Sequence, residues 1–349
     1  MSLFNVMRDT VSFPNLFEGE IEMNRVAFTV FGFEIHWYAI IIGLGLILAE
    51  LYCEKRGVKY GLTDDDVFDV AFIGGIAGFI GARAYYCIFW NLNPDNPWKF
   101  TLWTAITGIH KGGLAIYGGI IAGVLMAILI CKKKKVAVLP MMDMGGTGFL
   151  IGQAIGRWGN FVNVEAFGAP TAGNLPWGMG GSGSEITPIL EAAGEGALVH
   201  PCFLYESLWC GLGILVIHFI LSKIQTFDGE LFLYYVIWYG TGRGFIEGLR
   251  TDSLYIGPFR VSQLLAFSSA VFCIILLVYF KIKIKNTEGY VRWKDTEVCK
   301  KRMEAYNQSI ITDKETNKAI KAMKKFIKTS KKEEIAPSIL GDDDIDEKN

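Results

Sequence analysis

The chain has 349 residues, of which 51% are hydrophobic, and its mean hydropathy is +0.32. The apolar residues come in blocks of roughly twenty, the length that crosses a bilayer core, so a soluble globular protein is excluded. The formal net charge is only -1, which gives no basic excess for binding nucleic acid. The informative property is therefore how the charges are distributed along the chain.

Residues 1–35 form a predicted external N-terminal segment. Its first residues, MSLFNVMRDT, lack the basic-then-apolar order of a cleaved signal peptide, so we expect the first membrane span to act as the signal. Seven apolar segments follow, each long enough to cross a bilayer once tilt is allowed. They are residues 36–53, 67–90, 113–131, 137–158, 203–222, 231–249 and 260–281. The predicted fold class is all-α, a polytopic membrane protein with seven transmembrane helices in a catalytic domain at 36–285.

Basic residues set the expected orientation. They follow the first, third, fifth and seventh segments, as EKRGVK, KKKK, Lys223 and KIKIK. The long loop at 166–200, on the opposite side, contains no lysine or arginine. Because cytoplasmic loops carry the excess of lysine and arginine, this asymmetry predicts an external N-terminus and a cytoplasmic C-terminus.

Small residues predict how the helices pack. Glycines recur every four positions at Gly148, Gly152 and Gly156, at Gly74 and Gly78, and at Gly119 and Gly123. Such ridges let membrane helices approach closely. The seven cysteines form no CxxC pair and no regular spacing, so we read them as small apolar fillers, with no metal or disulfide framework.

Residues 286–349 are predicted to be a charged cytoplasmic tail, partly an amphipathic helix or disordered. The stretch KAIKAMKKFIKTSKK places Ile320, Met323 and Ile327 on one helical face among lysines. That pattern suits a helix on an anionic inner leaflet, and a solvated helix is the equal alternative.

Ionisable residues inside the apolar segments are candidates for function, because each costs roughly 2.5–3.5 kcal/mol on insertion scales. They are Asp69, Arg83, Asp143, Arg157, Glu206, His218, Arg243 and Glu247. We expect Asp69 and Asp143 to lock helices together, and His218 to cap a helix or snorkel. With the predicted topology the other five fall in the outer half of the membrane.

Two segments bring arginine to that depth. In GRWGNFVNVEAFG, Gly156 to Gly168, Arg157 and Asn160 share a helical face. In YGTGRGFIEGLR, Arg243, Glu247 and Arg250 follow at i, i+4 and i+7, also one face. An interhelical salt bridge is the structural alternative for each pair. Two arginines at phosphate depth favour a phosphodiester headgroup, which guanidinium binds bidentately.

These residues resemble those of the bacterial prolipoprotein diacylglyceryl transferase family. The family signature Gly-Arg-x-Gly-Asn-Phe-x-Asn-x-Glu-x-x-Gly fits GRWGNFVNVEAFG at every fixed position. HWY, GARAYY, GGLAIYGG, HPCFLYE and YGTGRGFIEGLR also match, in the family's order, from about residue 30 to 282. The tail beyond Lys285 is outside the resemblance.

The resemblance implies a membrane transferase. It would move the diacylglyceryl group of phosphatidylglycerol onto the lipobox cysteine thiol of a bacterial prolipoprotein, forming a thioether and leaving glycerol phosphate, as the first step of lipoprotein maturation. The implied location is the bacterial cytoplasmic membrane, with the active site towards the outer leaflet. The implied partners are phosphatidylglycerol and the prolipoprotein signal peptide, and no cofactor, metal or nucleotide is implied.

The resemblance and the charges together give the expected site. Arg157 and Arg243 would hold the departing phosphate, while Tyr239 and Glu247 are candidates for activating the thiol and Tyr117 is a catalytic candidate that serves by hydrogen bonding. Substrate binding is expected from Asn160, Asn163, Glu165, Gly168, Tyr38, Arg83 and Arg250, with His200, Tyr205 and Glu206 shaping the outer entrance. Tyr117 stands where many family members carry histidine, and His110 is a possible substitute.

Two other readings explain the same arginines. A transporter or lipid flippase would use them to pass an anion, and a structural subunit would only bind lipid. Transporters commonly place their charges near the bilayer midplane and show paired repeats. Here the charges crowd one leaflet and no repeat is visible, so the enzyme is favoured.

Overall fold

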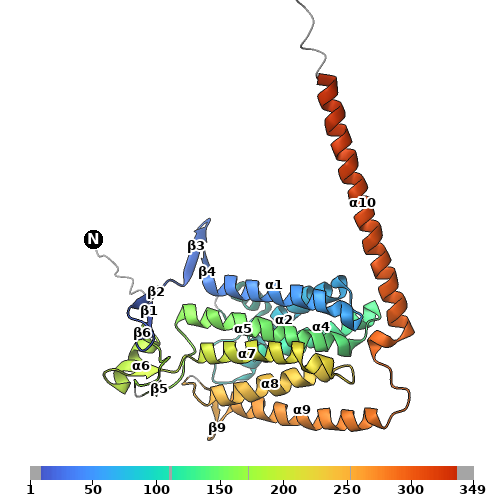
Figure 1. Ribbon diagram of the computed structural model, residues 1–349. Coiled ribbons are helices and arrows are strands. Elements are labelled where there is room, and N and C mark those ends of the chain that lie inside the picture. Colours follow the sequence, from blue (N-terminus) through green and yellow to red (C-terminus); the bar gives the residue numbers. More distant parts are fainter. Residues whose placement is uncertain (1–8, 110–111, 172, 252, 336–349) are drawn as a thin grey trace, which may run out of the picture. The chain divides into compact units, whose positions relative to one another are not determined.

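The computed structural model describes residues 9–109, 112–171, 173–251 and 253–335 (Figure 1). The chain forms two compact units, Met1–Asp295 and Thr296–Asn349. The first unit is a bundle of long helices with short strands at one end (Figure 1). The second contains one long helix, α10 (Glu297–Ile335).

A helix is present in each of the seven apolar segments. They are α1 (Trp37–Gly57), α2 (Asp64–Leu92), α4 (Ile116–Lys134), α5 (Val138–Asn163), α7 (Cys202–Phe219), α8 (Glu230–Glu247) and α9 (Val261–Lys285). Within the described residues, α1, α2, α4, α7 and α9 are long and apolar enough to cross a membrane. The helices α5 and α8 fall below that measure because glycine and polar side chains lower their hydropathy.

The expectation of an all-α chain is wrong at one end of the bundle. A small sheet has the order β2-β1-β6, and the hairpins β3–β4 and β8–β9 and the two-stranded pair β5–β7 accompany it. The strands are β1 (Asp9–Ser12), β2 (Glu20–Met23), β3 (Val26–Val30), β4 (Phe33–His36), β5 (Pro170–Thr171), β6 (Gly180–Ser182), β7 (Leu198–Val199), β8 (Tyr255–Ile256) and β9 (Phe259–Arg260). Two short helices, α3 (Leu102–Thr107) and α6 (Ile186–Ala193), lie in the connections. Most of the chain remains helical.

The three-stranded sheet joins the N-terminal segment to the 166–200 loop. Strand β1 pairs antiparallel with both β2 and β6, with Val11 opposite Gly181. Val11 and Phe13 are buried with Phe167, Met179 and Ile186 in one apolar cluster, which stabilises the sheet through burial. Figure 1 shows β1, β6 and α6 beside one another at the end of the bundle where α1 begins.

Small residues bring α2 and α4 together, as the glycine spacing predicted. A Cβ atom on Gly78 would lie 3.2 Å from the Gly119 carbonyl oxygen, and one on Gly74 would lie 3.7 Å from that of Gly123. Gly148 is similarly close to Cys53 of α1, with 2.8 Å to the sulfur. Gly152 meets α1 through its carbonyl oxygen, which lies 3.5 Å from the Cβ position of Gly45. The prediction is wrong for Gly156, whose Cβ position has no neighbouring atom within 4 Å.

Polar residues also join the helices. Asp69 of α2 pairs with Lys134 of α4 at 2.5 Å, and Asp143 of α5 accepts from the backbone of Gly229 and Phe232, so both lock helices as predicted. His218 differs from its expected role, because its Nδ1 lies 2.7 Å from the Tyr52 hydroxyl of α1. All seven cysteines are buried, which confirms their reading as fillers of the apolar interior.

Candidate active site

Glu206, near the start of α7, lies at the centre of the candidate site. Its Oε1 forms an ion pair with Arg157 Nη2 at 2.7 Å and accepts from the Tyr239 hydroxyl at 3.1 Å. Its Oε2 accepts from Arg243 Nη1 at 3.0 Å. The residue is only 1% exposed. Guanidinium groups from α5 and α8 therefore meet on one carboxylate of α7, and the role of Glu206 at the outer entrance stays a prediction.

Glu247 forms the second ion pair of the site. Its Oε2 lies 2.5 Å from Arg243 Nη2, one helical turn away in α8. This oxygen is buried and, among the described residues, has no hydrogen-bond donor with suitable geometry, so the contact is an ion pair by distance alone. A buried carboxylate oxygen of this kind retains the capacity to accept a proton or a hydrogen bond.

Glycines allow α7 and α9 to pack closely against α8 beside Arg243. A Cβ on Gly242 would lie 2.1 Å from Nε1 of Trp209, and one on Gly240 would lie 2.7 Å from the Ala266 carbonyl oxygen. Larger residues at these positions would force the helices apart. The Tyr239–Glu247 stretch thus combines the polar groups of the site with the small residues that let neighbouring helices approach it.

The end of α5 carries a second polar network. Arg157 Nη1 donates to the Asn160 side-chain oxygen at 3.2 Å, which confirms their shared face. The Nδ2 groups of Asn160 and Asn163 both donate to Oε1 of Glu165, at 2.8 and 3.2 Å. Helix α5 ends at Asn163, and Val164 adopts a left-handed conformation with φ 53°, which turns the chain so that Glu165 faces both amides.

Gly168 is the point where three parts of the chain meet. Its amide donates to the His200 carbonyl at 2.8 Å, and its backbone forms an antiparallel bridge with Arg250. A Cβ there would lie 2.8 Å from Cβ of His200 and 2.9 Å from Sγ of Cys202, so only glycine fits without displacement. This closure explains why the GRWGNFVNVEAFG segment ends in glycine.

Arg250 is placed by that bridge and not by α8. The helix ends at Glu247, so the single helical face predicted for Arg243, Glu247 and Arg250 holds only for the first two. The chain leaves the helix at Gly248 to reach Gly168. The positive charge of Arg250 still acts on Arg157, which puts a third guanidinium within electrostatic range of the site.

His200 and Tyr205 form a separate pair. The Tyr205 hydroxyl lies 3.1 Å from Nδ1 of His200 and accepts from Nε1 of Trp177 at 2.8 Å. Burial lowers the pKa of the His200 imidazole below its ordinary value of 6.5, so the ring is neutral at pH 7. Sequence reasoning missed Trp177, because a single tryptophan in a long loop carries no pattern that points to a hydroxyl partner.

Arg83 binds the chain itself. Its guanidinium donates to the carbonyl oxygens of Ala105, Gly112 and Gly113 at 2.8, 2.6 and 3.1 Å, and it lies 5.1 Å from the ring centre of Phe100. These contacts hold α3 and the connection to α4 against α2. A role for Arg83 in substrate binding stays a prediction.

Tyr38 and Tyr117 lie outside the contacts of the arginine cluster. The Tyr38 ring packs on α5, since a Cβ on Gly159 would lie 2.7 Å from its Cδ2. Tyr117 is in the first turn of α4 and is 41% exposed. Their substrate and catalytic roles stay predictions, and His110 lies outside the described residues.

Known proteins share this sequence over most of its length. The family model for prolipoprotein diacylglyceryl transferase matches residues 25–279. The phosphatidylglycerol–prolipoprotein diacylglyceryl transferase of Finegoldia magna is 42% identical over 267 residues, covering 76% of this chain and 99% of that relative. The protein of the same name from Clostridioides difficile is 40% identical over 265 residues, covering 76% and 98%. These matches confirm the resemblance seen in the motifs, and the chain belongs to the prolipoprotein diacylglyceryl transferase family.

Proposed function

We propose that this chain transfers the diacylglyceryl group of phosphatidylglycerol to the lipobox cysteine thiol of a prolipoprotein. The names of its relatives support phosphatidylglycerol and a prolipoprotein as substrates, and the lipobox cysteine is our extension of them. The observation that carries the proposal is the convergence of Arg157 and Arg243, from two helices, on the two oxygens of Glu206. Two guanidinium groups held this close together are suited to binding an anionic phosphate.

The reaction makes one bond and breaks one. The thiolate sulfur bonds to the glycerol carbon, the bond from that carbon to the phosphate oxygen breaks, and glycerol phosphate leaves with the electron pair. The phosphate changes from a diester with one negative charge towards a monoester with nearly two. Arg157 and Arg243 therefore bind the transition state more tightly than the substrate, which accelerates the reaction.

Glu206 orients the two guanidinium groups. Its carboxylate and that of Glu247 balance the charges of Arg157 and Arg243, so the four side chains together are neutral. Each guanidinium has five N–H donors, more than the contacts described above take up, and the others are available to phosphate oxygens. Fixing both forks before the substrate arrives removes the reorganisation that would otherwise accompany charge development.

We assign acceptance of the thiol proton to Glu247. A free cysteine has a pKa of roughly 8.5, so the thiol needs a proton acceptor and a positive field. Tyr239 donates its hydroxyl proton to Glu206 and is occupied as a donor. Glu247 Oε2 is buried beside Arg243 as an ion pair and, among the described residues, accepts no hydrogen bond of suitable geometry. This favours Glu247 over Tyr239 and Tyr117.

We further propose that α5 and α8 also cross the membrane, giving seven spans with the N-terminus outside. Helix α5 packs against α1, α7 and α8, and α8 packs against α9, so their polar faces contact protein. The lysine-rich ends of α4 and α9 lie at the opposite end of the bundle from β6 and β9 (Figure 1). This distribution supports an active site towards the outer leaflet.

The same orientation makes residues 286–349 a cytoplasmic tail after an external segment at 1–35 and a catalytic domain at 36–285. Ile320 and Met323 of α10 are 45% and 67% exposed among lysines, as a helix on an anionic surface requires. The side chain of Ile327 lies outside the described part of the chain.

The test uses purified full-length protein, vesicles containing labelled phosphatidylglycerol, and a lipobox peptide with cysteine or serine at the acceptor position. We expect one glycerol phosphate released per peptide modified, and only with cysteine. Arg157→Ala and Arg243→Ala should abolish transfer. Arg25 is the control, because it forms an ion pair with Asp9 in the N-terminal segment, and Arg25→Ala should retain transfer. Equal release with the serine peptide would refute the transfer, and normal turnover by both cluster variants would refute their roles.

A further inference from the structure

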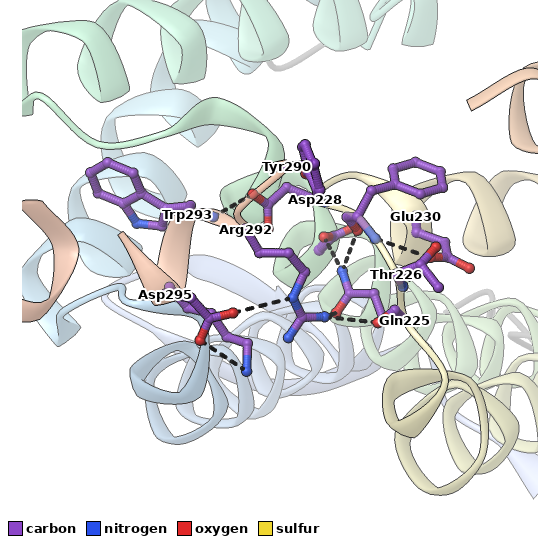
Figure 2. Close-up of polar contacts among 11 residues, drawn as sticks. Gln225, Thr226, Asp228, Glu230, Tyr290, Arg292, Trp293 and Asp295 are labelled. Atoms are coloured by element: carbon purple, nitrogen blue, oxygen red, sulfur yellow. Dashed lines mark hydrogen bonds and ion pairs between the residues drawn. The ribbon is translucent and has the colours of Figure 1, made fainter. Parts of the chain in front are cut away.

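The segment after α9 folds back onto the helix bundle. We name Tyr290–Asp295 the clasp; it contains the short helix η4 (Trp293–Asp295). Figure 2 shows the clasp against the loop that precedes α8. The Trp293 amide donates to Oδ2 of Asp228 at 2.7 Å, and the Asp228 amide donates to the Tyr290 hydroxyl at 3.2 Å. Nε1 of Trp293 donates to the Gly61 carbonyl at 3.3 Å, so the clasp also reaches the turn between α1 and α2.

The clasp lies beyond the part of the chain that the family model matches, which ends at residue 279. A contact between a segment outside that match and the loop that begins α8 needs an explanation within this chain.

Arg292 is the charged centre of the clasp (Figure 2). Its Nη1 donates to both the backbone and the side-chain oxygen of Gln225, at 3.0 and 3.2 Å. With its oxygen held by Arg292, the Gln225 amide turns its nitrogen towards Asp143, to which it donates at 2.8 Å. The amide therefore connects a cation on the clasp to a carboxylate on α5, with polarity matched at both ends.

Asp143 passes this connection to α8. It is fully buried, and it also accepts from the amides of Gly229 and Phe232 at 2.8 and 2.9 Å. These amides belong to the first turn of α8. A continuous set of polar contacts thus runs from the clasp through Gln225 to the beginning of both α5 and α8.

These two helices carry the site arginines at their other ends. Arg243 follows Glu230 by thirteen positions, about 20 Å along a helix. A tilt of α8 by about 3° at its base would displace Arg243 by about 1 Å relative to Arg157. Misplacement of that size reduces turnover by about a hundredfold.

The ion pair between Glu230 and Lys281, at 2.9 Å, does not replace this connection. It holds the beginning of α8 to α9, and α9 carries neither arginine of the cluster. At this end of the bundle α5 and α8 are also in apolar contact, because the Cβ position of Gly229 lies 3.2 Å from Leu139 and that of Gly146 lies 3.0 Å from Tyr235. Asp143 adds directional polar contacts to this packing, and Arg292 orients the amide that completes them.

We infer that the clasp positions Arg243 against Arg157 across the length of α8, with Arg292 as the positioning residue. The inference rests on the proposed roles of those two arginines in diacylglyceryl transfer. Arg292 touches no reacting atom. It acts by fixing the Gln225 amide, and a polar tail residue thereby sets the geometry of a distant site.

The kinetic test compares Arg292→Ala, Arg292→Lys and Lys294→Ala in the full-length protein. Lys294 is the matched control, because it is a clasp cation that forms an ion pair with Asp295 of the clasp itself, at 3.7 Å. With phosphatidylglycerol vesicles and a lipobox peptide, Arg292→Ala should lower kcat about tenfold, as expected for misplacement below 1 Å, with KM unchanged. Arg292→Lys should recover part of the loss and Lys294→Ala should match the parent. An unchanged kcat in Arg292→Ala would overturn the inference.

A second measurement tests the positioning role of the clasp independently of the proposed transfer activity. Spin labels on Trp158→Cys of α5 and Phe245→Cys of α8, both exposed positions near the site, report the spacing of the helix ends. The distance distribution should broaden with Arg292→Ala and stay narrow with Lys294→Ala. If the parent protein shows no transfer, the proposed function fails, while an unbroadened distribution in Arg292→Ala refutes the clasp.

Discussion

Replacing Glu206 with glutamine tests the centre of the site. The change keeps the size of the side chain and removes the charge shared by Arg157 and Arg243. The Glu206 side chain is 2% exposed, against 21% and 18% for the two arginines, so solvent does little to compensate the lost contacts. In the parent protein a carboxylate oxygen faces each guanidinium group. In the variant the NH₂ of the glutamine amide must face one of them.

The size of the effect follows from the burial of this pair. Breaking a buried ion pair by removing one partner costs about 3–5 kcal/mol, since the remaining charge is uncompensated. If about 3 kcal/mol of that loss reaches the transition state through misplaced arginines, kcat falls about a hundredfold. KM for phosphatidylglycerol should not rise, because the cluster gains one net positive charge.

The assay is steady-state transfer to a lipobox peptide at a series of phosphatidylglycerol concentrations. Tyr239→Phe is the matched control, because it removes one 3.1 Å hydrogen bond to the same carboxylate and leaves its charge. Loss of a hydrogen bond to a charged group costs about 1.5 kcal/mol, so kcat should fall about tenfold. A Glu206→Gln protein with the parent kcat would show that the carboxylate does not organise the arginines.

Three further changes test other parts of the molecule. Gly168→Ala should destabilise the fold by about 1–3 kcal/mol through overpacking, measured by thermal unfolding, and an unchanged midpoint would show that the junction adapts. Burial lowers the pKa of the His200 imidazole in the folded protein. The contribution of His200 to the free energy of unfolding is therefore complete above the ordinary pKa of histidine and is lost as the pH falls through the lowered pKa. His200→Asn should therefore flatten the decline in thermal stability from about pH 7 to about pH 5, and a parallel decline would contradict this. Ser184→Cys should react in intact cells with a membrane-impermeant thiol reagent and Ser309→Cys only after lysis; the reverse would overturn the proposed orientation.

The positions of the long helices were predictable because each apolar block has the length of a bilayer crossing. The predicted 67–90 and 260–281 correspond to Asp64–Leu92 and Val261–Lys285. Their ends differ by a few residues because caps and lysine-rich last turns extend the helices beyond the apolar blocks. At the first of these, the Thr63 side chain begins α2 by accepting from the Asp66 amide.

The pairing within the site was only partly predictable. Helical spacing gave the Arg157–Asn160 and Arg243–Glu247 pairs, because each lies within one helix. Glu206 could not be placed, because its position depends on how α7 packs between α5 and α8. Sequence also gave no sign of the clasp, since Arg292 lies among other charged tail residues and its partner is a glutamine 67 positions earlier.

The pairing of β1 with β6 sets an order of events during synthesis. Ribosomes release the N-terminus first, and Ser12 is made long before its partner Gly180. Val11 and Phe13 therefore stay partly exposed during synthesis, because residues that bury them, such as Met179 and Ile186, are made later. The sheet is completed late, because β1 can pair with β2 early but its other edge has no partner until β6 is made. A chain stalled before residue 180 would expose that edge and its apolar side chains to chaperones and proteases.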